Sequence, residues 1–342
     1  MAGEAALAEL DFTNGTAVEL RLRGLYSAEE DGAFQALLAE AIGRVAEIAR
    51  PGPSQLNFLL HQAERSCLEP ERIAALLAAL HGRAEADAAL GATWRAVARR
   101  QAFRAALADH RMAQPALVSL GLHCLPWKLL NRWGFRDRAQ FTALHTPFSM
   151  ALHKRDEVLR ALATDFADYA EPSLMRESTT PSGQRIAMRQ DGGAVWNHHR
   201  GPAWLEPDFA PLRRLLARRI ASFRTACALP GAVFVMADCR IQDPAAPIPF
   251  LAPLRAALAR LSGRPRPFLL LTSQSRRGGA ARLDWLDAET AHLAAPYPHP
   301  HFIWADAASV DSEEGLGFEH FYAQGVLACL TAWGFFARGA AA

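Results

Sequence analysis

The pattern of apolar and polar residues divides the chain into a helical first third and a longer part that alternates strands and helices. Over residues 27–110 apolar residues recur every three or four positions, in segments separated by Pro- and Gly-containing breaks. Over residues 10–26 an Asn-Gly pair and an alternation of apolar residues predict a β-hairpin. We therefore expect residues 1–112 to form a helical extension with a short hairpin at its start.

After Pro115 the pattern changes to short continuous apolar runs, which are typical of strands buried on both faces. These runs are Ala116–Leu120, Ala232–Ala237, Pro267–Thr272 and His301–Ala305. Helical periodicity separates them, at Arg155–Ala163, Asp208–Cys227, Pro249–Leu261 and Glu319–Arg338. A polar stretch from Glu171 to Gly193 predicts a hairpin, and Ala194–His199 a short strand. The fold class predicted for residues 113–342 is α/β, with a mostly parallel sheet flanked by helices.

The stretch Ala116–Gly134 predicts a strand, a tight Gly turn and a helix, with Cys124 where the helix begins. A thiol at a helix N-terminus feels the positive end of the helix dipole, which favours the thiolate. Cys124 is therefore a candidate nucleophile. A small, easily buried cysteine at such a turn also has a structural alternative, in which it only packs.

Composition narrows the class of protein. Of the 342 residues 51% are hydrophobic and 21% charged, and the net charge of +2 gives no reason to expect nucleic-acid binding. Five scattered cysteines without a CxxC pair argue against a disulfide framework and fit a reducing cytoplasm. The N-terminus lacks the features of a signal peptide, and we interpret the apolar segment Phe321–Ala337 as a buried helix rather than a membrane span. Histidines are frequent, but no HExxH or CxxC spacing predicts a metal site, and no cofactor motif is present.

The thiol needs a general base, and the sequence offers one at the end of another predicted strand. His198 and His199 precede a Gly-Pro loop, and functional side chains of a parallel sheet gather at the carboxyl ends of its strands. We therefore expect one of these histidines to meet Cys124 in a Cys–His pair. Asp238, directly after an apolar run, is placed to orient that histidine. The backbone N–H groups after Gly121 would serve as an oxyanion hole.

The densest positive patch lies on the predicted helix Asp208–Cys227. Arg213, Arg214, Arg218 and Arg219 are spaced so that several share a helix face. Such a patch could hold a phosphate, a nucleotide-sugar or an acidic glycan. The alternative is a solvated face with no ligand.

The motifs together resemble those of the bacterial papain-like cysteine peptidases, a family that began as a domain of unknown function. The resemblance covers roughly residues 115–275 and leaves out the helical first third. Its segments are Ser119–Cys124, Pro147-Phe148-Ser149-Met150, Trp196-Asn197-His198-His199, Arg218-Arg219 with Phe223, and Val233-Phe234-Val235. The Gly-x-x-Cys turn is also similar to the first turn of SGNH-type esterases. The resemblance implies a cysteine hydrolase with Cys124 and a histidine at its centre.

The chain departs from the family pattern at three positions. Ser149 stands where the family has an aspartate, Met150 replaces an aromatic residue, and His199 replaces an acidic residue. If either missing carboxylate orients the family's histidine, this chain is impaired or uses Asp238 instead.

Three classes of function follow from the sequence. The first is a cysteine-dependent hydrolase or acyl transferase, acting on a small molecule, peptide or glycan. The second is a non-catalytic or sugar-handling protein that binds an anionic glycan or nucleotide-sugar through the arginine-rich helix. The third is an interaction scaffold that binds a protein partner through residues 1–112.

Overall fold

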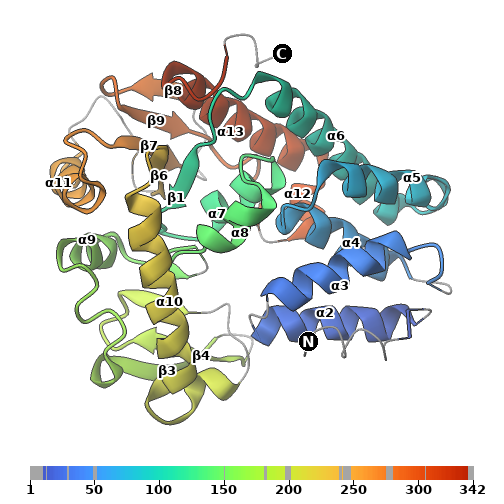
Figure 1. Cartoon of the computed structure of the whole chain (residues 1–342), viewed down its shortest axis with the longest axis horizontal. Coiled ribbons are helices and arrows are strands. Elements are labelled where there is room, and N and C mark those ends of the chain that lie inside the picture. Colours follow the sequence, from blue (N-terminus) through green and yellow to red (C-terminus); the bar gives the residue numbers. More distant parts are fainter. Residues whose placement is uncertain are drawn as a thin grey trace.

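The computed structural model describes most of the chain, and Figure 1 shows its helical first third beside a sheet layered between helices. The described residues are 11–12, 14–28, 31–48, 52–149, 151–180, 183–196, 202–238, 241, 248–274, 280–304 and 306–337. Met150, His198 and His199 lie outside these ranges.

The larger sheet has the strand order β1-β6-β7-β9-β8. Its parallel strands are β1 (Ala116–Ser119), β6 (Ala232–Ala237), β7 (Phe268–Ser273) and β9 (Thr290–Ala294), and β8 (Arg282–Trp285) pairs antiparallel to β9. The predicted α/β class with a mostly parallel sheet is confirmed. The carboxyl ends of β1, β6 and β7 therefore meet at one edge of the sheet.

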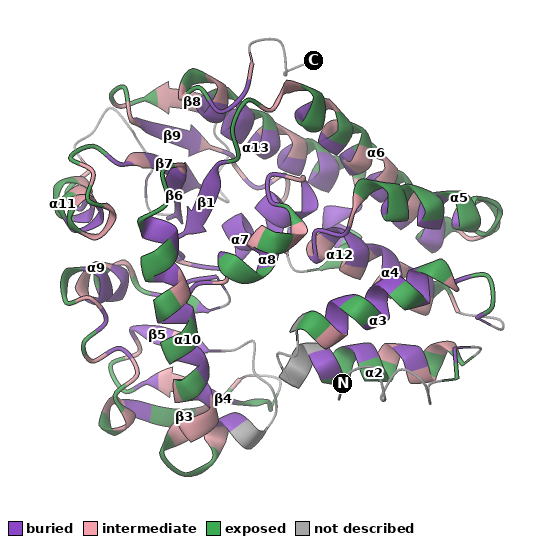
Figure 2. Cartoon of the chain, in the orientation of Figure 1, coloured by how far each residue is buried: buried purple, intermediate pink, exposed green. Residues whose placement is uncertain are grey.

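The four parallel strands are buried on both faces: successive strand residues point to opposite sides, and helices cover each side. Val118 and Phe234 pack in one apolar cluster with α9, α10 and α11, whereas Leu117 and Val235 pack in a second with α7 and α13. Figure 2 shows the sheet buried between helices whose outer turns are exposed. Each fully buried side chain of this size contributes on the order of 2 kcal/mol.

The helices of the first third form a cluster with its own apolar core. They are α2 (Gly15–Ala28), α3 (Asp31–Gly43), α4 (Pro53–Arg65), α5 (Pro70–Ala86) and α6 (Ala88–His110). The last of them, α6, also packs Leu107 into the sheet's core.

The remaining helices surround the sheet. They are α7 (Leu125–Arg132), α8 (Arg138–Ala143), α9 (Arg155–Ala163), α10 (Ala210–Cys227), α11 (Leu251–Ser262), α12 (Ala307–Val310) and α13 (Glu313–Ala332), with short 3-10 helices at Pro172–Leu174, Pro202–Leu205 and Pro207–Phe209. Within the described ranges, no helix combines the length and apolarity needed to cross a membrane.

The strands of a second sheet lie between β1 and β6 in the sequence. It has the order β2-β5-β4-β3 and is antiparallel, with β2 (Leu152–His153), β3 (Met175–Thr179), β4 (Arg185–Arg189) and β5 (Ala194–Trp196). β3 and β4 form the hairpin predicted within the polar stretch. The short strand predicted from Ala194 is present as β5.

The predicted N-terminal hairpin is wrong, because this segment is the helix α2. The side chain of Asn14 accepts a hydrogen bond from the Ala17 N–H (3.1 Å), so it caps a helix instead of forming a turn. Val18 and Leu22 are buried, but Leu20 between them is 64% exposed. Val18 and Leu22 are four residues apart, so they lie on the same buried face of the helix, and the alternation with Leu20 does not mark a strand.

The strand predicted at residues 301–305 is also wrong, since residues 301–304 are irregular. The fourth parallel strand is β9, which lies just before three prolines at alternate positions, Pro296, Pro298 and Pro300. Proline cannot donate to a strand ladder, so the chain leaves the sheet there. This places Trp304 in the loop before α12 and close to the candidate nucleophile.

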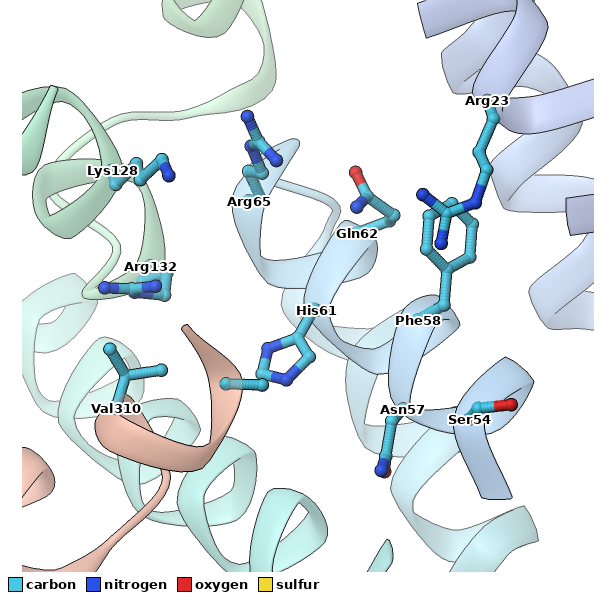
Figure 3. Close-up of a pocket in the computed structure, with 11 residues that line it drawn as sticks. Arg23, Ser54, Asn57, Phe58, His61, Gln62, Arg65, Lys128, Arg132 and Val310 are labelled. Atoms are coloured by element: carbon cyan, nitrogen blue, oxygen red, sulfur yellow. The ribbon is translucent and has the colours of Figure 1, made fainter. Parts of the chain in front are cut away.

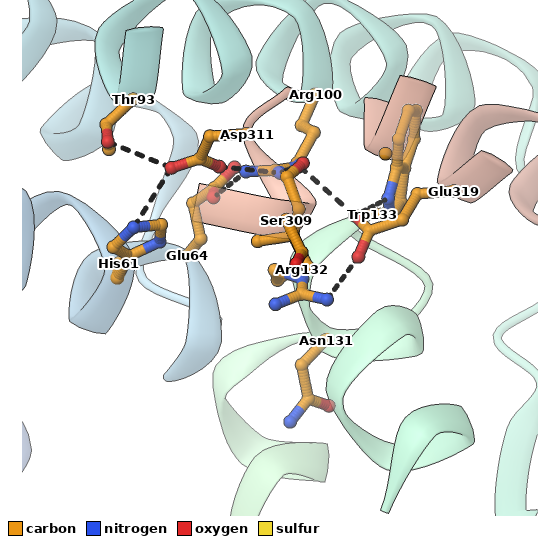
Figure 4. A network of polar contacts seen from close by, with 12 residues as sticks. His61, Glu64, Thr93, Arg100, Asn131, Arg132, Trp133, Ser309, Asp311 and Glu319 are labelled. Atoms are coloured by element: carbon orange, nitrogen blue, oxygen red, sulfur yellow. Dashed lines mark hydrogen bonds and ion pairs between the residues drawn. The ribbon is translucent and has the colours of Figure 1, made fainter. Parts of the chain in front are cut away.

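A buried ionic network joins the helical third to the α/β part (Figure 4). The Arg100 side chain of α6 is fully buried and pairs with Glu64 (2.9 Å), Asp311 (3.0 Å) and Glu319 (3.4 Å). Glu319 also pairs with Arg132 of α7. The network therefore links α4 and α6 to the three elements that carry Arg132, Asp311 and Glu319.

We expect Arg100→Met to lower the free energy of unfolding by about 3–5 kcal/mol, because it leaves three buried carboxylates short of their shared counter-ion. The control is Arg99→Met, since Arg99 is 48% exposed and its nearest carboxylate, Glu313, is 3.6 Å away. This control should cost less than about 1 kcal/mol. Urea denaturation followed by tryptophan fluorescence measures both, and equal losses would contradict the assigned role of Arg100.

Candidate active site

The turn after β1 is fixed to the neighbouring strand by backbone hydrogen bonds. Gly121 has a φ of +87°, a conformation that favours glycine. Its carbonyl accepts from the Ala237 N–H (2.8 Å), and the Leu122 N–H donates to the Ala237 carbonyl (3.0 Å). This turn places Cys124 directly before α7, at the carboxyl edge of the sheet, as the sequence predicts.

The Cys124 thiol is buried, with the residue 4% exposed, and it has a hydrogen-bond donor beside it. The indole N–H of Trp304 donates to Sγ at 3.3 Å. Trp304 comes from the loop before α12, so the thiol lies between elements 180 residues apart in the chain. A donor aimed at sulfur stabilises the thiolate more than the neutral thiol.

His123 lies beside the thiol, but its ring is engaged elsewhere. The ring contacts Trp304, with 4.6 Å between centroids, and Nδ1 accepts from the Leu125 N–H (3.3 Å). Burial lowers the pKa of His123 to about 4, although a hydrogen bond with Gln274 and the charge of Asp238 act in the opposite direction. His123 is therefore neutral at pH 7 and supports the Trp304 ring.

Lys128 is a titratable neighbour of the thiol that the sequence interpretation missed. It lies one helical turn after Cys124 on α7 and is 8% exposed. Burial lowers the pKa of Lys128 to about 8; Cys124 acts in the opposite direction, and the charges of Arg65 and Arg132 lower it further. Roughly a tenth of the lysine is then neutral at pH 7. The i, i+4 spacing from Cys124 was the sequence signal for this contact.

Asp238 lies at the same sheet edge, directly after β6, and is buried. It forms an ion pair with Arg155, at the start of α9, whose guanidinium also lies over the Phe250 ring at 4.2 Å. His198 and His199, the predicted bases, fall outside the described residues, so their distances from Cys124 and Asp238 are not part of this geometry. No group of three or more potential metal ligands occurs within the described part of the chain.

Some of the backbone N–H groups predicted to form an oxyanion hole after Gly121 already donate hydrogen bonds within the fold. The Leu122 N–H is committed to the sheet, and the Leu125 N–H donates to His123. The N–H of Cys124 donates to no acceptor among the described residues. Of these three N–H groups, the one of Cys124 is therefore the one that the fold does not use.

The segment that resembles the family's Pro-Phe-Asp-Trp motif has a packing role here. The Phe148 ring packs in an aromatic cluster with His153, Phe166 and Phe223. The Ser149 hydroxyl accepts from the Thr146 N–H (3.0 Å) and closes a turn. The Ser149 hydroxyl is thus committed to a hydrogen bond inside its own loop.

The four arginines of α10 are dispersed rather than gathered into one patch. Arg213 donates to the Ala170 carbonyl (3.2 Å), and Arg219 is buried, whereas Arg214 and Arg218 are exposed. Only the last two share an open face, one helical turn apart. The stronger concentration of positive charge lies at α4 and α7, where Arg65, Lys128 and Arg132 line a cavity of about 410 Å³.

No family model, no curated protein and no solved structure matches this chain.

We expect His123→Gln to reduce the acid sensitivity of the fold. His123 takes up a proton near pH 6.5 when unfolded but only near pH 4 when folded, so unfolding binds a proton between these values. The free energy of unfolding then falls by about 1.4 kcal/mol for each pH unit on acidification through this window, and the variant loses this contribution.

Denaturant titrations at several pH values between about 4 and 7 measure this slope. Some slope remains in the variant, because burial also lowers the pKa of His153, to about 3. The matched control is His81→Gln, at a histidine whose side chain is 59% exposed. If the pH dependence of the free energy of unfolding is the same in His123→Gln as in the original protein, His123 is not a buried, neutral histidine.

Proposed function

We propose that the protein is a cysteine-dependent hydrolase or acyl transferase with Cys124 as its nucleophile. The observation that carries the proposal is the position of this thiol, at the start of α7 and the carboxyl edge of the sheet, with the Trp304 indole N–H donating to it and Lys128 one turn away. These features place a hydrogen-bond donor and a titratable amine near the sulfur, and cysteine nucleophiles are found in polar surroundings of this kind.

The reaction begins when the thiolate sulfur attacks an acyl carbonyl carbon. A C–S bond forms, the bond from carbon to the leaving group breaks, and the leaving group takes a proton from the general acid. Water, or an acceptor in the transferase case, then attacks the thioester, gives its proton to the general base and releases the thiolate. The Cys124 N–H supports the oxyanion in both steps.

The general base has two candidate sources. The sequence favours His198 or His199, oriented by Asp238. The described residues offer Lys128, whose lowered pKa of about 8 makes proton exchange with the thiol feasible near neutral pH.

We expect iodoacetamide to alkylate Cys124 in the native protein at least about tenfold faster than the other described cysteines near pH 7.5, because thiolate character determines the rate. Burial raises the pKa of Cys67 to about 11 and those of Cys227 and Cys329 to about 12, so these three are internal controls. Peptide mass spectrometry measures all four rates in one sample. If Cys124 stays inert until the protein is denatured, its role is packing, and the hydrolase proposal fails.

We expect Lys128→Met to slow Cys124 alkylation and to remove an inflection near pH 8 from its pH profile, because the ammonium that favours the thiolate is lost. Lys154→Met is the matched control, since Lys154 is exposed and is the only other lysine in the sequence. His198→Ala and His199→Ala, measured alongside, identify the base. A histidine variant that abolishes the reactivity while Lys128→Met leaves it unchanged assigns the role to the Cys–His pair.

A further inference from the structure

A cavity of about 410 Å³ lies where the helical third meets the α/β part (Figure 3). One wall is the length of α4, and the opposite side is formed by Lys128 and Arg132 of α7. Arg23 of α2 stands at the rim, and Ala307 and Val310 of α12 complete the lining. Its volume lies within the range of sites for small molecules.

The lining of this cavity is basic. It includes Arg23, His61, Arg65, Lys128 and Arg132, and no Asp or Glu among the described residues lines it. The carboxylates that pair with some of these groups lie outside the lining of the cavity: Glu19 contacts Arg23, Asp311 contacts His61, and Glu319 contacts Arg132.

Lys128 is a buried member of this set. It forms no ion pair with any described carboxylate, although it is 8% exposed. Arg65 and Arg132 both repel its charge, which adds to the effect of burial in lowering the pKa of Lys128. Such a concentration of like charge in a concave, partly desolvated place is unfavourable for the fold alone and favourable for a bound anion.

We propose that this cavity binds a small organic phosphate, with Arg65, Lys128 and Arg132 around the phosphate group. Guanidinium groups match phosphate oxygens with paired N–H donors, and an ammonium adds a point charge. Phe58 and Val310 give the organic part apolar contacts, and Ser54, Asn57 and Gln62 offer neutral hydrogen bonds. The cavity shares Lys128 with the proposed catalytic site, but binding of the phosphate needs no reaction at Cys124.

Isothermal titration calorimetry on the full chain tests the proposal, with ribose 5-phosphate, inorganic phosphate and citrate as probes at about 0.15 M ionic strength. We expect ribose 5-phosphate to bind once per chain, inorganic phosphate to compete for the same site, and citrate to bind at least about tenfold more weakly. Arg65→Gln and Lys128→Gln should each weaken ribose 5-phosphate binding by about tenfold or more.

The matched control is Arg214→Gln, which removes an exposed arginine of α10 and should leave the affinity unchanged. Cys124→Ala should also bind normally, so a failed hydrolase proposal does not remove this site. Absence of binding by both phosphate probes, citrate binding as tight as ribose 5-phosphate, or equal affinities in Arg65→Gln and Arg214→Gln would each overturn the proposal. Circular dichroism of each variant separates loss of binding from loss of fold.

Discussion

The rest of the structure depends on one buried guanidinium. Arg100 has no exposed side-chain surface and lies among Glu64, Asp311 and Glu319, each from a different helix or loop. A charge in such a place is tolerable only when its partners are held close, because its desolvation costs several kcal/mol. The same condition applies to the carboxylates. Apolar contacts are not directional, so packing alone would allow the helical third and the α/β part a range of relative positions. The ion pairs of Arg100 restrict that range.

This constraint reaches the candidate active site by two routes. Glu319 pairs with Arg132 at the last turn of α7, and α7 begins at Cys124. Asp311 follows α12, and the loop before α12 carries Trp304, which donates to the thiol. Arg100 is thus connected, through Glu319 and Arg132, to the helix that presents the sulfur and, through Asp311, to the segment that follows Trp304. The helical third, which lies outside the family resemblance, is part of what orders the site.

The sequence predicted what depends on local pattern and missed what depends on distant partners. The strand–turn–helix around Cys124, and the placement of Asp238 after a parallel neighbour, follow from apolar runs and from the rule that such strands end at one edge. The apolar run at residues 301–305 predicts a strand, which hides the position of Trp304; the three prolines just before it are the signal against that strand. Lys128 is visible at i+4 from Cys124 and at i−4 from Arg132, but its burial and its neighbour Arg65 arise only when α4 packs on α7. At Asn14-Gly15 the local pattern itself is ambiguous, because an asparagine is suited both to a turn and to a helix cap. The burial of Val18 and Leu22 on one face selects the helix.

The two proposals meet at Lys128, which lines the cavity and lies one turn from the thiol. An anion beside this lysine favours its ammonium form, because opposite charge stabilises the charged state. An ammonium near Cys124 in turn favours the thiolate, yet a lysine held in that form no longer accepts a proton. Occupancy of the cavity would therefore shift Lys128 from the role of base to that of electrostatic support. Such a coupling is reciprocal: the change that phosphate binding makes to the free energy of proton transfer at Lys128 equals the change that proton transfer there makes to the free energy of phosphate binding.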